Sequence, residues 1–103
     1  METPTVEAQN AQAEAAQKAT PRKYRVVMLN DDYTPMEFVV IVLIRLFSHS
    51  FEEAHAIMLK VHKEGHGVCG VFSREMAETK ADLAMRIAAE NEFPFQCVVE
   101  PEE

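Results

Sequence analysis

The sequence predicts a small single domain of the α/β (α+β) class, in which three helices cover one face of a three-stranded sheet. Short β-branched runs bounded by turn residues indicate three strands, and Ser/Thr-x-x-Glu capping signals mark the start of two helices. The expected element order is βααβαβ, which gives a sandwich of two layers. We expect the sheet to be antiparallel or mixed.

The run KYRVVMLN, residues 23–30, predicts the first strand, and the turn NDDYTP follows it. We expect a helix after this turn, because Thr34 can act as the N-cap, Pro35 suits the first helical position and Glu37 completes a capping box. These signals assign the following apolar run to a helix that ends near Ser48, although its composition alone would suggest a strand.

A second helix follows at once. Ser50 and Glu53 form another capping box, and we expect the helix to run to about Glu64, where glycines stop it. Residues 67–72 then predict the second strand.

A third helix and a last strand complete the predicted domain. Ser73 precedes a strongly helical composition, and residues 95–99 predict the last strand beyond Pro94. Apolar residues recur near helical spacing and predict the face of this third helix that packs on the core: Met76, Ala77, Leu83, Ala84, Ile87 and Ala88.

The charge of the chain argues against several classes of partner. Its 103 residues include 17 acidic and 10 basic side chains, a formal net charge of −7. Nucleic acids and anionic membranes need clustered lysines and arginines, and no such cluster is present. The start METPTVEAQN lacks a secretory signal, and no apolar run nears the ~18 residues of a membrane span. We therefore expect a cytoplasmic protein that binds neither nucleic acid nor membrane.

Residues 1–20 differ in composition from the rest of the chain. They are rich in Ala, Gln, Glu and Thr and have no apolar stripe with which to dock. We expect a flexible N-terminal tail, followed by one domain at residues 21–103. Cys69 and Cys97 lie in apolar, strand-like runs of that domain, where buried free thiols are favoured over a disulfide.

The turn Asn30-Asp31-Asp32 could carry chemistry. Adjacent acids at a strand end can hold Mg²⁺ in receiver domains, but that site needs a third acid at another strand end. Asp82 falls within a helix instead. Local sequence alone favours a structural role, in which the side chains of Asn30 and Asp32 bond the backbone of the turn.

The histidines offer no convincing metal site or catalytic base. His62 and His66 have the spacing of a helical zinc pair, but Gly65 interrupts the helix and no third ligand has suitable spacing. The structural alternative for His62 is a half-buried side chain beside Met58. With no recognisable nucleophile or phosphate loop, we expect a protein that is not an enzyme and needs no metal or cofactor.

The first helix is more apolar than a surface helix requires. Its predicted core stripe is ordinary: Met36, Val39, Val40, Leu43 and Phe47. Ile41 and Ile44 lie beside that stripe and widen it. The sequence leaves two explanations open, deeper burial or a surface that binds a partner or a second copy.

Several motifs in the correct order resemble the ClpS family, the bacterial N-degron adaptors of the Clp protease. The resemblance covers residues 23–103. It is carried by NDDYTPMEFV (30–39), MLKVH (58–62), GVCGVF (67–72) and AETK (77–80).

This resemblance implies a binding site for protein N-termini. The residues that match the family's receptor for the free α-amino group are Asn30, Asp31, Asp32 and His62. The positions that match its hydrophobic pocket for a first Leu, Phe, Tyr or Trp side chain are Thr34, Met36, Val39, Met58, Val61 and Phe95. Met36 matches the gatekeeper against β-branched first residues, and Phe95 stands where we expect Leu.

The resemblance also implies partners. Glu75 and Lys80 match positions that contact the N-terminal domain of the ClpA unfoldase, which feeds the ClpP protease, and the tail would assist delivery. The alternative is a protein-interaction module that resembles the C-terminal domain of the ribosomal stalk protein and has no N-degron recognition. That fold does not require an Asn-Asp-Asp turn that faces a histidine.

Overall fold

The computed structural model describes residues 22–102, and the tail predicted at residues 1–20 lies outside them. The elements follow the predicted order: β1 (Tyr24–Leu29), α1 (Met36–Phe47), α2 (Phe51–Glu64), β2 (His66–Phe72), α3 (Arg74–Glu90) and β3 (Gln96–Pro101). Element ends differ from the sequence prediction by one or two residues. The last strand, for example, begins at Gln96 and continues to Pro101.

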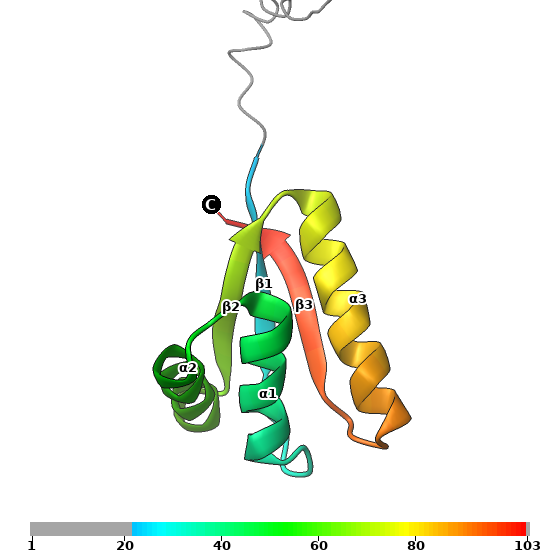
Figure 1. The fold of residues 1–103 in the computed structure, drawn as a ribbon. Coiled ribbons are helices and arrows are strands. Elements are labelled where there is room, and N and C mark those ends of the chain that lie inside the picture. Colours follow the sequence, from blue (N-terminus) through cyan, green and yellow to red (C-terminus); the bar gives the residue numbers. More distant parts are fainter. Residues whose placement is uncertain (1–21, 103) are drawn as a thin grey trace, which may run out of the picture.

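The sheet has the strand order β2-β1-β3, and both pairings are antiparallel. All three helices lie on one face of the sheet, as predicted (Figure 1). Met28 on the central strand pairs with Gly67 on one side and with Cys97 on the other. The turn that leaves β1 therefore starts from the middle of the sheet, between the other two strands.

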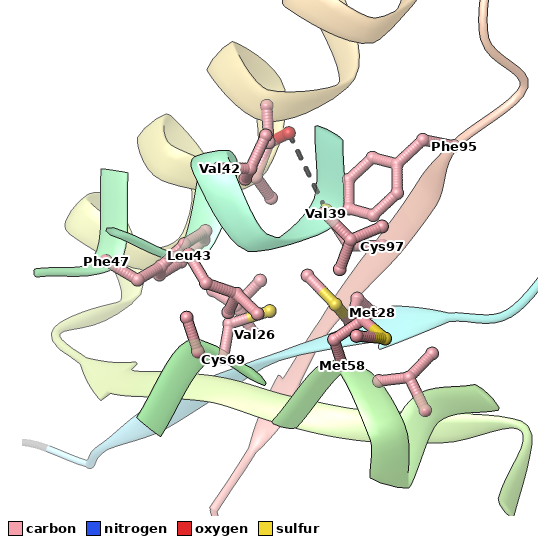
Figure 2. Close-up of a cluster of buried hydrophobic side chains, with 14 of the residues drawn as sticks. Val26, Met28, Val39, Val42, Leu43, Phe47, Met58, Cys69, Phe95 and Cys97 are labelled. Carbon is pink, nitrogen blue, oxygen red and sulfur yellow. Dashed lines mark hydrogen bonds between the residues drawn. The ribbon is translucent and has the colours of Figure 1, made fainter. Parts of the chain in front are cut away.

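The core lies between the sheet and the helices (Figure 2). Met28, Leu43 and Cys69 bring side chains from β1, α1 and β2 into its fully buried part. Cys97 on β3 is also buried, and its thiol donates a weak hydrogen bond to the carbonyl of Ala81 at 3.7 Å. Both cysteines are free, which confirms the prediction of buried thiols.

Helix α3 contacts the core through smaller side chains than predicted. Met76 and Leu83, expected in the core, are exposed. Its buried residues follow a helical spacing of four, three and four positions, and all are alanines: Ala77, Ala81, Ala84 and Ala88. Small side chains along this stripe let the helix axis approach β1 and β3 closely.

The start of α1 also differs from the prediction. The helix begins at Met36, with Pro35 at the N-cap position and no side-chain cap. Thr34 precedes the N-cap position, and its hydroxyl donates to Oδ2 of Asp31 at 2.8 Å within the turn. Met36, predicted in the core stripe, is 47% exposed. The capping signal thus marked the correct helix, but its threonine serves the preceding turn.

The other two helices begin as predicted. Ser50 and Glu53 form the full capping box of α2, and the side chain of Ser73 accepts a hydrogen bond from the third residue of α3.

Candidate functional site

The turn between β1 and α1 is built around the carboxylate of Asp31. Its Oδ1 accepts hydrogen bonds from the backbone N–H groups of Tyr33 and Thr34 at 2.8 and 2.7 Å, and Oδ2 accepts the Thr34 hydroxyl. Partial burial raises the pKa of Asp31, but the hydrogen bonds from Thr34 and Tyr33 outweigh it, so the pKa falls below its usual value. Asp31 therefore remains ionised and fixes the turn between Asn30 and Asp32.

One backbone hydrogen bond joins this turn to the end of α2. The N–H of Asn30 donates to the carbonyl of Gly65 at 2.9 Å. Gly65 ends α2 in the left-handed region, with φ of 93°, a conformation that favours glycine. Because His62 lies in the last turn of α2, this bond brings the Asn-Asp-Asp turn and His62 to the same end of the sheet.

Gly67 allows α2 to lie close to β2. A Cβ atom added at Gly67 would stand 2.8 Å from Cγ2 of Val61, a β-branched side chain with little freedom to move. The glycine therefore lets Val61 occupy the space between the helix and the sheet.

The turn, α1 and the end of α2 enclose a cleft of about 160 Å³. Its lining contains every residue predicted to bind the N-terminus except Phe95: Asn30, Asp31, Asp32, Thr34, Met36, Val39, Met58, Val61 and His62. The polar members come from the turn and from His62, and the apolar members come from α1 and α2. The structure thus brings together two predicted sets of residues that are separated by up to 32 positions in the sequence.

Phe95 lies deeper than the other predicted pocket residues. It is 2% exposed and packs edge-to-face on Phe38, with the ring centroids 6.1 Å apart. Together with Met28, Val39 and Val61 it lines a second, small cavity of about 20 Å³ that also reaches Asn30, Asp31 and Thr34. Phe95 therefore bounds the space behind the main cleft.

His62 is exposed, which corrects the structural alternative of a half-buried histidine. Asp32 is exposed as well. His66 begins β2 opposite Leu29 and does not line the cleft. Within residues 22–102 no three His, Cys, Asp or Glu side chains lie close enough together to hold a metal ion.

The composition of the cleft suits a primary amine that carries an apolar group. Amide, carboxylate and imidazole groups offer hydrogen-bond acceptors at one end, and apolar side chains line the other. Neither cysteine lines it, and burial raises the pKa of both thiols, that of Cys97 to about 11. The cleft thus has the chemistry of a binding site without a thiolate nucleophile.

Glu75 and Lys80, the predicted partner contacts, lie on α3 outside the cleft. Glu75 is exposed in the first turn of that helix. Lys80 is half-buried; its Nζ donates to the carbonyl of Leu46 at 2.7 Å and lies 5.5 Å from the centre of the Phe72 ring. Lys80 therefore also ties α3 to the last turn of α1.

A second depression, which sequence reasoning did not identify as a site, adjoins the cleft. It is an apolar groove of about 510 Å³ between α1 and α2, lined by Met36, Glu37, Val40, Ile41, Ile44, Phe51, His55 and Met58. The surplus of apolar residues at Ile41 and Ile44 was its only sequence signal.

The fold and this cleft can be compared with known proteins. A family model described as ATP-dependent Clp protease adaptor protein ClpS matches residues 19–98 of the chain. The chain belongs to the ClpS family. The family and its relatives are named as adaptors of a protease and not as proteases.

Two ClpS relatives show how far the similarity extends. The chain is 55% identical to the ClpS adapter of Variovorax paradoxus over 83 residues, which cover 81% of this chain and 70% of the relative. It is 58% identical to the ClpS adapter of Rhodospirillum centenum over 80 residues, which cover 78% of this chain and 74% of the relative.

A solved ClpS structure has the same fold. The structure of Agrobacterium tumefaciens ClpS2 bound to L-phenylalaninamide superimposes with a TM-score of 0.78 at 42% identity, and the match covers 81% of this chain and all of that one. Across residues 22–102, no helix is both long and apolar enough to cross a membrane.

Proposed function

We propose that this ClpS-family adaptor binds proteins through a free N-terminal Leu, Phe, Tyr or Trp residue and delivers them to the Clp protease. The single observation that carries the proposal is the cleft, in which the acceptors of the Asn-Asp-Asp turn and His62 adjoin an apolar recess. Hydrolysis is left to the protease, and no cofactor is required.

The α-amino group binds at the polar end of the cleft. An ammonium has three N–H donors, which match the amide oxygen of Asn30, the carboxylate of Asp32 and a ring nitrogen of neutral His62. Asp31 adds negative charge, but its oxygens already accept three hydrogen bonds from the turn. We therefore assign it mainly to positioning Asn30 and Asp32.

The first side chain enters the apolar recess between α1 and α2. An apolar cavity of about 150 Å³ can hold a benzene ring, so the cleft of about 160 Å³ suits one aromatic or leucine side chain. Met36 and Met58 have adaptable side chains that can fit flat and branched groups alike. Met36 at the rim would exclude β-branched residues, whose extra methyl group lies next to the backbone.

The expected affinity is modest. Each charge-assisted hydrogen bond contributes ~1.5–3 kcal/mol, and burial of one Leu or Phe side chain adds ~1.5–3 kcal/mol. Loss of free rotation and ordering of the peptide cost several kcal/mol. A net value of about 8 kcal/mol corresponds to a Kd on the order of micromolar, which suits a carrier that must release its cargo.

The ligand of the Agrobacterium relative supports this assignment. L-phenylalaninamide has a free α-amino group and a phenylalanine side chain, and its carboxamide stands in for the first peptide bond of a protein. That relative is described as bound to this molecule. The same ligand class fits the polar end and the apolar recess of the cleft described above.

Delivery would use a different surface. We assign Glu75 and Lys80 on α3 to contact with the N-terminal domain of ClpA, and residues 1–20 to transfer of the cargo. A flexible tail at residues 1–20, a domain at 21–103 and a cytoplasmic location remain predictions from the sequence.

Fluorescence anisotropy tests the proposal. A labelled peptide that begins with Leu should bind, and its N-acetylated twin should not. His62→Ala should weaken binding by about tenfold or more, because it removes one charge-assisted hydrogen bond to the amino group. His66→Ala is the matched control, because His66 is an exposed histidine outside the cleft. Equal binding of both peptides would show that the cleft does not recognise a free amino group and would overturn the proposal.

A further inference from the structure

The apolar groove between α1 and α2 is not explained by core packing. Three of its side chains are strongly exposed: Met36 at 47%, Ile41 at 51% and Phe51 at 61%. Phe51 stacks on His55, with the ring centroids 5.8 Å apart, so its ring forms one wall of the groove and does not turn into the core. Together with the half-buried Ile44, these side chains make four large apolar residues that line one continuous depression.

The groove is continuous with the cleft. Met36 of α1 and Met58 of α2 line both depressions, so these two side chains form the rim between them. The turn residues and His62 occupy the polar end of the cleft. A peptide whose amino group lies at that end would leave the cleft over the methionine rim and pass along the groove.

The distance from Met36 to the middle of the groove shows which residue of such a peptide would reach it. In an extended peptide, successive side chains point to opposite sides, so the first and third residues face the protein together and lie about 6.5–7 Å apart. An α-helix rises about 1.5 Å per residue, so Val40 and Ile41 lie about 6–7.5 Å along α1 from Met36. The third side chain of such a peptide would therefore fall over Val40 and Ile41, and the second would point to solvent.

We propose that this groove is a second specificity site, which binds a large apolar side chain at the third position of the substrate. This inference rests on the proposed function, because it requires the amino group to lie at the polar end of the cleft. Glu37 lines the groove and the chain carries a formal charge of −7. An acidic third residue would therefore be disfavoured both by repulsion and by the cost of burial.

Three peptides test the proposal on the full chain, two of them of identical composition. They begin Leu-Gly-Leu, Leu-Leu-Gly and Leu-Gly-Gly, continue identically and carry the same C-terminal fluorophore. Anisotropy should show about fivefold to tenfold tighter binding of Leu-Gly-Leu than of Leu-Gly-Gly, because one leucine side chain is partly buried. Leu-Leu-Gly should bind like Leu-Gly-Gly.

Substitutions then locate the effect. Ile41→Asp should bring the ratio of the Leu-Gly-Leu and Leu-Gly-Gly affinities close to one, and Ile44→Gln should reduce that ratio in the same way. Val98→Asp is the matched control, since Val98 is an exposed apolar residue on β3, where it pairs with Val27 away from the groove. It should leave both affinities unchanged.

The outcomes separate this inference from the proposed function. If all three peptides bind equally but N-acetylation still abolishes binding, the groove proposal is wrong and the proposed function stands. If N-acetylation has no effect, the proposed function itself fails. If Ile41→Asp leaves the peptide preference intact but removes concentration-dependent self-association in sedimentation, the groove binds a second copy and the proposal is overturned.

Discussion

At the scale of single residues, Asp31 matches a residue that binds the amino group, but its hydrogen bonds show that it mainly positions its neighbours. Three hydrogen bonds from Tyr33 and Thr34 hold its carboxylate within the turn. Asn30 and Asp32, which flank Asp31 in the turn, both line the cleft. Local sequence favoured such Asx-type bonding by Asn30 and Asp32, whereas in the structure Asp31 accepts these hydrogen bonds.

Asp31→Ala should therefore weaken both the fold and binding. Loss of these hydrogen bonds should lower the free energy of unfolding by about 1–2 kcal/mol, which urea denaturation measures. Asp32→Ala should weaken peptide binding with little change in stability.

Because the pKa of Asp31 is lowered in the folded state, the contribution of Asp31 to stability is present at neutral pH and lost as the pH falls through that lowered value. A variant Asp31→Ala as acid-sensitive as the unmodified chain would contradict this role.

At the scale of secondary-structure elements, the site depends on the close approach of α2 to β2. Gly67 permits that approach, and the Val61 side chain beside it lines the cleft. The spacing of sequence motifs does not reveal that Val61 and Gly67 lie against each other, because these residues belong to different elements.

Gly67→Ala should displace Val61 and narrow the cleft. The added methyl group would stand 2.8 Å from Val61 Cγ2, so either the valine or the strand must shift. We expect a loss of about 1–3 kcal/mol in stability and weaker binding of Leu and Phe peptides. Gly65→Asn is a useful contrast, since asparagine tolerates the left-handed conformation and nothing lies within 4 Å of an added Cβ. Equal effects of the two substitutions would argue against the role of Val61.

The sequence predicted the elements better than their faces. Hydrophobic runs and capping residues gave all six elements of residues 22–102 in the correct order. They misplaced Met36 and Leu83 in the core, because hydropathy does not reveal how closely a helix approaches a sheet. In α3 the alanines at 77, 81, 84 and 88 fill that narrow space, and the larger side chains turn outward. Thr34 was misassigned because threonine is common both at helix caps and in turns, and here its hydroxyl donates to Asp31 in the turn.

At the scale of the whole molecule, the antiparallel sheet assembles the site from distant segments. The turn after β1 and the end of α2 meet through the Asn30–Gly65 hydrogen bond. Composition and periodicity do not predict this pairing, and the site residues were predicted from the family resemblance. The groove beside the cleft required the relative orientation of α1 and α2, which only the three-dimensional structure provides.

The buried thiols tie global stability to alkaline pH. Burial raises the pKa of Cys69, and that of Cys97 to about 11, whereas an unfolded thiol ionises near 8.5. Above pH 8.5 the unfolded chain binds fewer protons than the folded one, so stability should fall as the pH rises toward 11. Urea denaturation at pH 8, 9 and 10 measures this decline, and Cys97→Ala should reduce it.

Thiol labelling tests the burial of the two cysteines. In native protein at pH 8, iodoacetamide should modify both thiols far more slowly than in urea; rapid labelling of the native protein would contradict their burial.

Calorimetric titration of the full chain with L-phenylalaninamide is the most direct test of whether the cleft recognises a free amino group beside an apolar side chain. This ligand has no second residue, so it isolates the cleft from the groove. We expect saturable binding of one molecule per chain. Binding should be abolished when N-acetyl-L-phenylalaninamide is used, and weakened by His62→Ala but not by Ile41→Asp. Equal heats for the free and acetylated ligands would contradict this expectation.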